Sequence, residues 1–201
     1  MSVPGMLWLA VVRSPHAHAR IKKIDLKAAR AAEGVVAAYS GDDLVGDFAG
    51  PLPCAWPVTE DIKMPAHWPL ARDKARYAGD GVAVVVAESR AAAKDAAELV
   101  SVDYDVLPAV TEVEAAAADG APVLHDDFGT NVSYVWKLDA GEVEQCFADA
   151  AVTVEERYFQ TRLIPTAIEP RGGLVQPSPA TGELTMHTAT QIPHILRTLS
   201  A

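Results

Sequence analysis

The chain has 201 residues, of which 50% are hydrophobic and 22% are charged, as in an ordinary folded protein. Its formal net charge of −10 disfavours binding to nucleic acids and to anionic membrane surfaces, because both carry negatively charged phosphates that the protein would repel. Two cysteines, Cys54 and Cys146, are too few for a disulfide framework or an iron–sulfur cluster, so we expect a reducing, cytoplasmic setting.

The first elements are predicted to be strands with one short helix between them. The apolar run at residues 6–12 is too short for a membrane span and lacks the basic start of a signal peptide, so it is interpreted as a buried strand. Further strands are expected at residues 19–24 and 35–39, with a helix at 26–32. Gly34 follows that helix at a position typical of a left-handed cap.

A long irregular region rich in Pro and Gly follows at residues 41–72. Loops of this length within a domain are functional or pack on a partner. Trp56 and Trp68 favour packing over disorder. The pair Asp42-Asp43 is interpreted as negative charge at the N-terminus of a helix.

Residues 77–108 predict a strand, a helix and a second strand. The β-branched run at 82–87 is typical of a strand buried on both faces, and Ser89 is a good N-cap for the helix after it. The second strand, residues 102–106, is stopped by Pro108. A connection of about a dozen residues suits two parallel strands better than a hairpin, so we expect these two strands to be parallel neighbours in one sheet. The core face of the helix is predicted to be Ala92, Ala96, Leu99 and Val100.

A short helix at 112–118 ends the first predicted domain, residues 1–118, and the second comprises residues 119–201. The second domain is expected to contain strands at 132–136 and 151–158, a helix at 142–148, a hairpin formed by 172–176 and 183–188, and an apolar helix at 193–199. The last helix presents an apolar face without a partner, formed by Ile192, Ile195, Leu196 and Leu199.

Most polar motifs have a plain structural interpretation. His16 and His18 would point to one face of a strand, which is a metal-binding geometry, but no third ligand is near and a polar strand end is favoured. The glycines around Asp80 precede a strand, whereas a dinucleotide fingerprint precedes a helix, so they predict a tight turn. The pair Asp126-Asp127 is interpreted as a solvated loop.

Two later motifs have more functional character. Glu169 and Arg171 flank Pro170 and could form a buried ion pair or anchor an active-site loop, and a structural role is favoured. Gln191 lies where a strand end leads into a helix, a place where functional side chains are common. Its amide can both donate and accept a hydrogen bond, so it could hold a small polar ligand.

Several spans, in order along nearly the whole chain, carry a family resemblance: residues 13–21, 33–35, 40–44, 77–108, 140–158, 168–171 and 188–194. Together they resemble the large, molybdenum-carrying subunit of the molybdenum hydroxylases, the family of xanthine dehydrogenase, aldehyde oxidase and carbon monoxide dehydrogenase. The resemblance implies an α+β fold, an α/β hammerhead domain followed by the incomplete start of a molybdopterin-binding domain.

The resemblance also implies a chemistry. The family uses a molybdopterin-type molybdenum cofactor to oxidise an aldehyde, a heteroaromatic compound or carbon monoxide, with water as the oxygen source. Gln191 matches the glutamine whose amide hydrogen-bonds the oxo ligand of the metal, so it is the expected cofactor-binding residue. No catalytic residue and no metal ligand is expected in this chain, because the general-base glutamate and the glycine-rich loop match positions beyond Ala201.

The expected partners follow from the same resemblance. They are the remainder of the large subunit and the subunits or domains that carry iron–sulfur clusters and FAD, and a dimer of heterotrimers is one such assembly. We therefore expect a fragment or split subunit that is inactive and does not bind the molybdenum cofactor when isolated. The alternative is a non-catalytic interaction module built on the hammerhead scaffold, and a small hydrolase is a third, weaker hypothesis because no serine has a nucleophile-elbow context.

Overall fold

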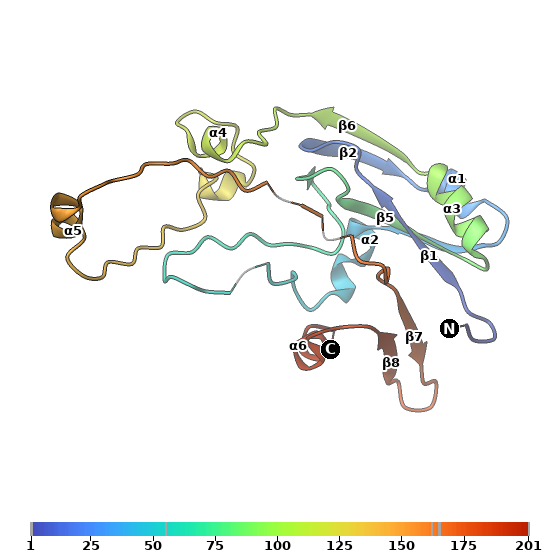
Figure 1. The fold of residues 1–201 in the computed structure, drawn as a ribbon. Helices are drawn as coiled ribbons and strands as arrows, with labels where there is room; N and C mark the ends of the chain where they lie inside the picture. The colour runs from blue at the N-terminus through green and yellow to red at the C-terminus, as the bar shows by residue number, and fades with distance from the viewer. Residues whose placement is uncertain (1, 55, 162, 165, 201) are drawn as a thin grey trace. The chain divides into compact units, whose positions relative to one another are not determined.

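Two three-stranded antiparallel sheets form the first unit of the chain, residues 2–136 (Figure 1). The computed structural model describes residues 2–54, 56–161, 163–164 and 166–200. The first sheet has the order β1 (Trp8–Arg13), β5 (Gly81–Ala87) and β3 (Val35–Ser40). The second has the order β4 (Lys74–Ala75), β2 (Ala19–Asp25) and β6 (Ser101–Val106). All of these strands were predicted except the two-residue β4.

The central strand β5 is buried or half-buried along its whole length, as its continuous β-branched sequence predicts. It pairs antiparallel with β1 on one side, where Leu9 lies opposite Val86, and with β3 on the other, where Tyr39 lies opposite Val84. Val85 is fully buried between these neighbours, and its burial contributes about 1.5–3 kcal/mol.

Two helices, α1 (Lys27–Arg30) and α3 (Arg90–Glu98), pack on the first sheet and enclose the main core. The helix α3 begins as predicted, because the Ser89 side chain accepts a hydrogen bond from the Ala92 N–H at 3.1 Å. The buried core residues are small or aliphatic: Leu26, Ala29, Ala38, Ala83, Val85 and Ala96.

One residue of the predicted core face of α3 is misplaced. Leu99 is the C-cap residue and is 48% exposed, because the helix ends at Glu98 and Leu99 lies past the packed turns. The residue that pattern analysis missed is Ala93, which is buried beside Ala96. The predicted Ala96 and Val100 do pack on the core, together with Ala97, so Leu99 is the misplaced residue.

The predicted parallel pairing of the strands on either side of α3 is wrong. Both edges of β5 are occupied by β1 and β3, whereas β6 pairs antiparallel with β2 in the other sheet, with Ile21 opposite Tyr104. The helix α3 is thus a connection between two sheets rather than a crossover within one.

The irregular region after β3 opens with a well-capped helical turn, α2 (Gly41–Leu44), followed by the 3₁₀ turn η1 (Val45–Asp47). Ser40 and Asp43 form a reciprocal capping box, and the backbone N–H of Ser40 is the main cause that lowers the pKa of the Asp43 carboxyl. The acidic pair at the helix start is confirmed. Glycine is required at position 41 because the backbone there lies close to the Arg72 side chain: an added Cβ would lie 2.7 Å from Arg72 Cγ.

The loop that continues to β4 is only partly packed. Trp68 lies against Phe48 with ring centroids 6.3 Å apart, and Leu52 forms a single β-bridge with His67. Trp56, by contrast, is 72% exposed, so its predicted packing is wrong.

The first unit ends in the helix α4 (Val113–Ala117), the 3₁₀ turn η2 (Asp126–Phe128) and an irregular segment that reaches Trp136. The helix confirms the prediction for residues 112–118. The strand predicted at 132–136 is absent from this described segment, because its backbone bonds to the loop at one place only, where the Lys63 N–H donates to the Ser133 carbonyl at 3.0 Å.

The second unit, from Lys137 onward, contains the helix α5 (Val143–Asp149), a hairpin of β7 (Gly173–Pro177) and β8 (Leu184–Thr188), and the helix α6 (Pro193–Ser200). These four elements were predicted. The strand predicted at 151–158 is not formed, because the described part of the chain offers it no partner, and Val152 and Val154 are 78% and 81% exposed.

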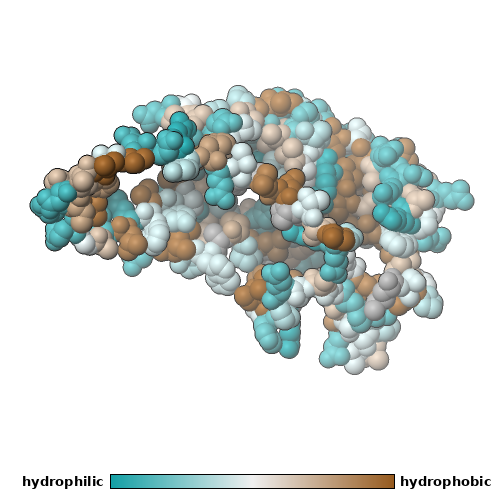
Figure 2. Space-filling model, viewed as in Figure 1, coloured by the Kyte–Doolittle hydropathy of each residue, from teal (hydrophilic) through white to brown (hydrophobic). Residues whose placement is uncertain are grey.

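The surface of the chain carries many apolar side chains. Figure 2 shows hydrophobic residues in brown among the polar ones. Within the second unit none of the described residues is buried, and Phe147 is 61% exposed. Among the described helices, none has both the length and the apolar character needed to cross a membrane.

Candidate functional site

The candidate site lies at the junction between β8 and α6. The hairpin positions it: β7 and β8 pair from Gly173 opposite Thr188 to Pro177 opposite Leu184. The open end of the hairpin is closed by the Thr188 hydroxyl, which donates to the Gly172 carbonyl at 2.9 Å. The backbone therefore enters the junction from a fixed strand end.

The junction itself is short and hydrogen-bonded. The Ile192 N–H donates to the Thr190 hydroxyl oxygen at 3.1 Å, and the Ile192 carbonyl accepts from the Leu196 N–H at 2.9 Å. Gln191 lies between Thr190 and Ile192, at the strand–helix junction that the sequence predicts. Its side chain is exposed and forms no hydrogen bond within the described residues.

This arrangement suits hydrogen bonding to a polar ligand rather than metal ligation. The amide of Gln191 offers two N–H donors and a carbonyl acceptor, and no other side chain of the described part satisfies them. Nearby on the hairpin, His187 Nε2 lies 3.0 Å from Gln176 Oε1. No group of three or more His, Cys, Asp or Glu in the described chain is arranged to hold a metal ion.

The motif around Pro170 does not contain the buried ion pair that was one interpretation of its sequence. Glu169 and Arg171 are both exposed, and no ion pair joins them in the part that the structure describes.

The two histidines of the H-x-H motif are not on a strand and do not act together. Both lie between β1 and β2, where the His16 ring contacts Tyr104 edge-on at 5.0 Å. His18 is 6% exposed, and its Nδ1 lies 2.8 Å from the Pro108 carbonyl oxygen. Because a carbonyl only accepts, Nδ1 carries the proton, and the buried Nε2 has no partner among the described residues.

The predicted tight turn before β5 is confirmed, and it encloses a buried carboxylate. Gly79 has φ +95°, and Asp80 is 6% exposed and accepts a hydrogen bond from the Arg76 backbone N–H at 3.1 Å.

Two tyrosine side chains lie near the Asp80 carboxylate. Burial raises the pKa of Tyr77, and the Asp80 charge raises it further; burial likewise raises the pKa of Tyr104. This polar cluster is part of the scaffold.

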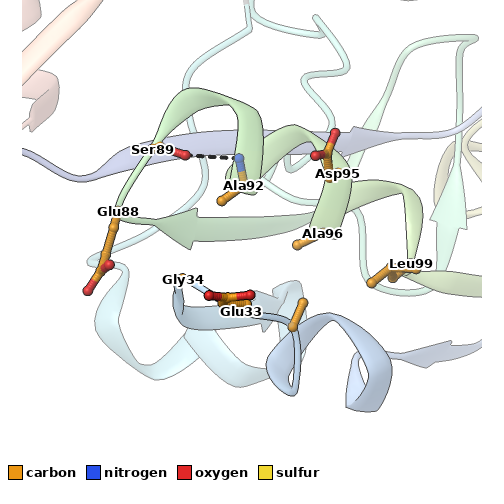
Figure 3. Close-up of a pocket in the computed structure, with 9 residues that line it drawn as sticks. Glu33, Gly34, Glu88, Ser89, Ala92, Asp95, Ala96 and Leu99 are labelled. Carbon is orange, nitrogen blue, oxygen red and sulfur yellow. Dashed lines mark hydrogen bonds between the residues drawn. The ribbon is translucent and has the colours of Figure 1, made fainter.

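A surface pocket of about 520 Å³ lies between α3 and the turn before β3 (Figure 3). Figure 3 shows the carboxylates of Glu33 and Glu88 near its rim, and Asp95 also lines it. The Ser89 hydroxyl is already used in capping the helix. Three carboxylates would repel an anionic cofactor, so this pocket is not the candidate cofactor site.

An ion pair that pattern analysis missed joins β4 to η2. Lys74 Nζ donates to Asp126 Oδ2 at 2.6 Å, so Asp126 has a partner that its interpretation as part of a solvated loop did not include, although its side chain is 63% exposed. The hydrogen bond from Lys74 is the main cause that lowers the pKa of the Asp126 carboxyl. No local sequence signal indicates a pair between residues so far apart in the chain.

Two family models match the chain. The aldehyde oxidase and xanthine dehydrogenase a/b hammerhead domain matches residues 1–108, and the molybdopterin cofactor-binding domain matches residues 124–201. These matches confirm the expected hammerhead domain followed by the start of a molybdopterin-binding domain within an α+β fold.

Individual relatives match almost the whole chain. The carbon monoxide dehydrogenase large chain of Hydrogenophaga pseudoflava is 35% identical over 212 residues, covering 99% of this chain and 26% of that protein. The nicotinate dehydrogenase large molybdopterin subunit of Eubacterium barkeri is 33% identical over 198 residues, covering 96% of this chain and 42% of that protein. The crystal structure of quinoline 2-oxidoreductase from Pseudomonas putida 86 superimposes with a TM-score of 0.90 at 37% identity, covering 99% of this chain and 25% of that one. The chain thus spans between a quarter and less than half of the length of these proteins.

Proposed function

This chain belongs to the aldehyde oxidase and xanthine dehydrogenase family, and from that premise we propose that it supplies the N-terminal part of the large subunit of a molybdenum-dependent oxidoreductase. The complete enzyme oxidises an aldehyde, a heteroaromatic compound or carbon monoxide with water as the oxygen source. The observation that carries the proposal is that the hammerhead and cofactor-binding matches follow one another in the family's order over nearly all 201 residues.

Within this enzyme, Gln191 is the residue that contacts the cofactor. The molybdenum centre supplies the oxidation of substrate when it is bound. Gln191 would hold the cofactor by hydrogen bonding, since its amide is exposed and has no partner in the described chain. The short junction between Thr188 and Pro193 holds the Gln191 backbone between two regular elements, which limits the positions that the amide can reach.

The proposed assembly has several parts. The remainder of the large subunit supplies the general base, and iron–sulfur and flavin subunits accept electrons, in a dimer of heterotrimers. We place the boundary between the two sequence domains at residues 118 and 119, which falls between the two family matches. The two free thiols, Cys54 and Cys146, suit a reducing compartment such as the cytoplasm.

Metal analysis together with a redox-dye assay tests the proposal. The purified 201-residue chain is expected to contain no stoichiometric molybdenum and to reduce no dye, because no residue in it matches the general base. The complete large subunit that carries this chain, purified with its partner subunits, is expected to contain molybdenum and to reduce dye with an aldehyde, a heteroaromatic compound or carbon monoxide.

Two results would contradict the proposal. Molybdenum bound stoichiometrically to the isolated chain would show that its cofactor site is complete. A complete subunit without molybdenum or dye reduction would instead favour the non-catalytic interaction module.

A further inference from the structure

The first unit contains a buried ammonium group with a single counter-charge. Lys74 lies in the two-residue strand β4, and its side chain is 4% exposed. Its Nζ has one acceptor among the described residues, Asp126 Oδ2 at 2.6 Å, whereas the Asp126 side chain is 63% exposed. The pair is therefore asymmetric: the cation is enclosed and the anion reaches water. A buried ammonium that loses its counter-charge is strongly destabilised.

Asp126 belongs to an irregular segment, residues 119–136, which we call the strap. Asn131 holds the strap both internally and to α4: its side-chain oxygen accepts the Leu124 N–H at 2.9 Å, and its Nδ2 donates to the Ala116 carbonyl at 3.0 Å. Near its end, Ser133 exchanges two hydrogen bonds of 3.0 Å with the backbone of Lys63 in the long loop. Beyond Trp136 the second unit begins. Among these contacts of the strap, the Lys74–Asp126 pair is the one ion pair within the described residues.

We propose that the Lys74–Asp126 pair is an electrostatic latch, which keeps the strap docked on β4 only while Asp126 is negatively charged. With the strap docked, the ammonium is enclosed and needs the carboxylate. With the strap lifted, water solvates the ammonium instead. Neutralising Asp126 removes the counter-charge from the docked state only, so it shifts the equilibrium toward the lifted strap.

The surrounding charges keep the latch closed near neutral pH. Arg20 and Arg76 add to the effect of Lys74 in lowering the pKa of Asp126. The neighbouring His125 has its pKa lowered first by burial and then by Arg76 and Lys74, so it adds no positive charge there at neutral pH.

Hydrogen exchange on the 201-residue chain tests the latch. The variant Asp126→Asn is expected to accelerate exchange of strap amides, such as the Leu124 N–H, and of the Lys63 N–H that bonds to Ser133, by about ten- to hundredfold. Amides of β5 should be unchanged, because the core does not depend on the strap. The control Asp127→Asn alters the adjacent exposed carboxylate, which forms no ion pair in the described structure, and should exchange as the parent chain does.

A double variant separates the latch from general destabilisation. Combining Lys74→Met with Asp126→Asn removes both charges, so the strap should dock again and its amides should return to slow exchange. The latch is overturned by unchanged strap exchange in Asp126→Asn, by an equal acceleration in β5, or by a double variant that exchanges as fast as Asp126→Asn.

Discussion

Gln191 illustrates how single side chains in this protein divide into those used by the fold and those left available. Ser40, Ser89 and Asn131 all have their polar atoms satisfied by nearby backbone, so they are structural. The Gln191 amide is exposed and unsatisfied within the described chain, although the Ile192 N–H beside it is hydrogen-bonded to the Thr190 hydroxyl. A free polar group on a constrained backbone is suited to hold a ligand.

The substitution Gln191→Ala in the complete large subunit tests the role proposed for this residue: turnover is expected to fall about 10²-fold through loss of the proposed hydrogen bond to the cofactor. The melting temperature should change little, since the side chain makes no contact that the fold requires. Turnover with a redox dye and thermal unfolding measure the two effects. Gln145→Ala is the matched control, as Gln145 is an exposed glutamine bonded only to Asp149 among the described residues. Parallel losses of activity and melting temperature in Gln191→Ala would assign it a structural role.

At the scale of elements, α3 shows how small side chains set the packing distance. Its buried residues are both alanines, Ala93 and Ala96, so the helix backbone can approach β5 and β1 closely. The Ser89 cap fixes where the helix begins, and so determines which alanines face the sheet. Ala96 also lines the surface pocket of Figure 3, whereas Ala93 does not and is 1% exposed, so a larger side chain at Ala93 has no space to occupy.

The variant Ala93→Leu should therefore lower the free energy of unfolding by about 1–3 kcal/mol through overpacking. Ala91→Leu places the same side chain on the exposed side of the same helix and should change stability by less than about 0.5 kcal/mol. Chemical denaturation of the two variants measures the difference. If Ala91→Leu lowered the free energy of unfolding as much as Ala93→Leu, close packing of α3 on the sheet would not be the cause.

At the scale of the whole molecule, the two units differ in how they are stabilised. The first has a core of buried aliphatic residues between two helices and a sheet. The second has a two-stranded hairpin and two short helices with no buried residue in its described part. A two-stranded hairpin without a packed face is at best marginally stable in water. The second unit consequently exposes apolar surface that would be buried on contact with other polypeptide.

The isolated 201-residue chain is expected to self-associate through α6. Ile195 and Leu199 are 36% and 44% exposed on this helix, and apolar surface of this kind favours burial. Light scattering across a range of concentrations should show a mass that rises above the 21.3 kDa of the chain. The double variant Ile195→Lys, Leu199→Lys should shift the mass toward the monomer, whereas Thr198→Lys, which adds charge without removing an apolar side chain, should shift it less. A monomer at every concentration would contradict this expectation.

The local elements follow directly from the sequence. The β-branched run of β5, the Ser89 cap and the capping-box pair of Ser40 and Asp43 act over a few residues, so their structures could be predicted. The position of Gln191 between a strand and a helix was also predicted this way, because a strand end followed by a helix start is a local pattern. The order of family-like spans was likewise sufficient to indicate the family.

Partner choice between distant segments was decided only in three dimensions. The placement of β5 and β6 in different sheets, the unpaired segment at 151–158 and the Lys74–Asp126 pair each depend on which remote residues are near. A hydrophobic pattern states that a segment can be a strand, but its backbone hydrogen bonds need a second strand that the pattern does not name. Burial of Lys74 likewise arises from the surroundings that the fold assembles, because its own sequence neighbourhood is polar.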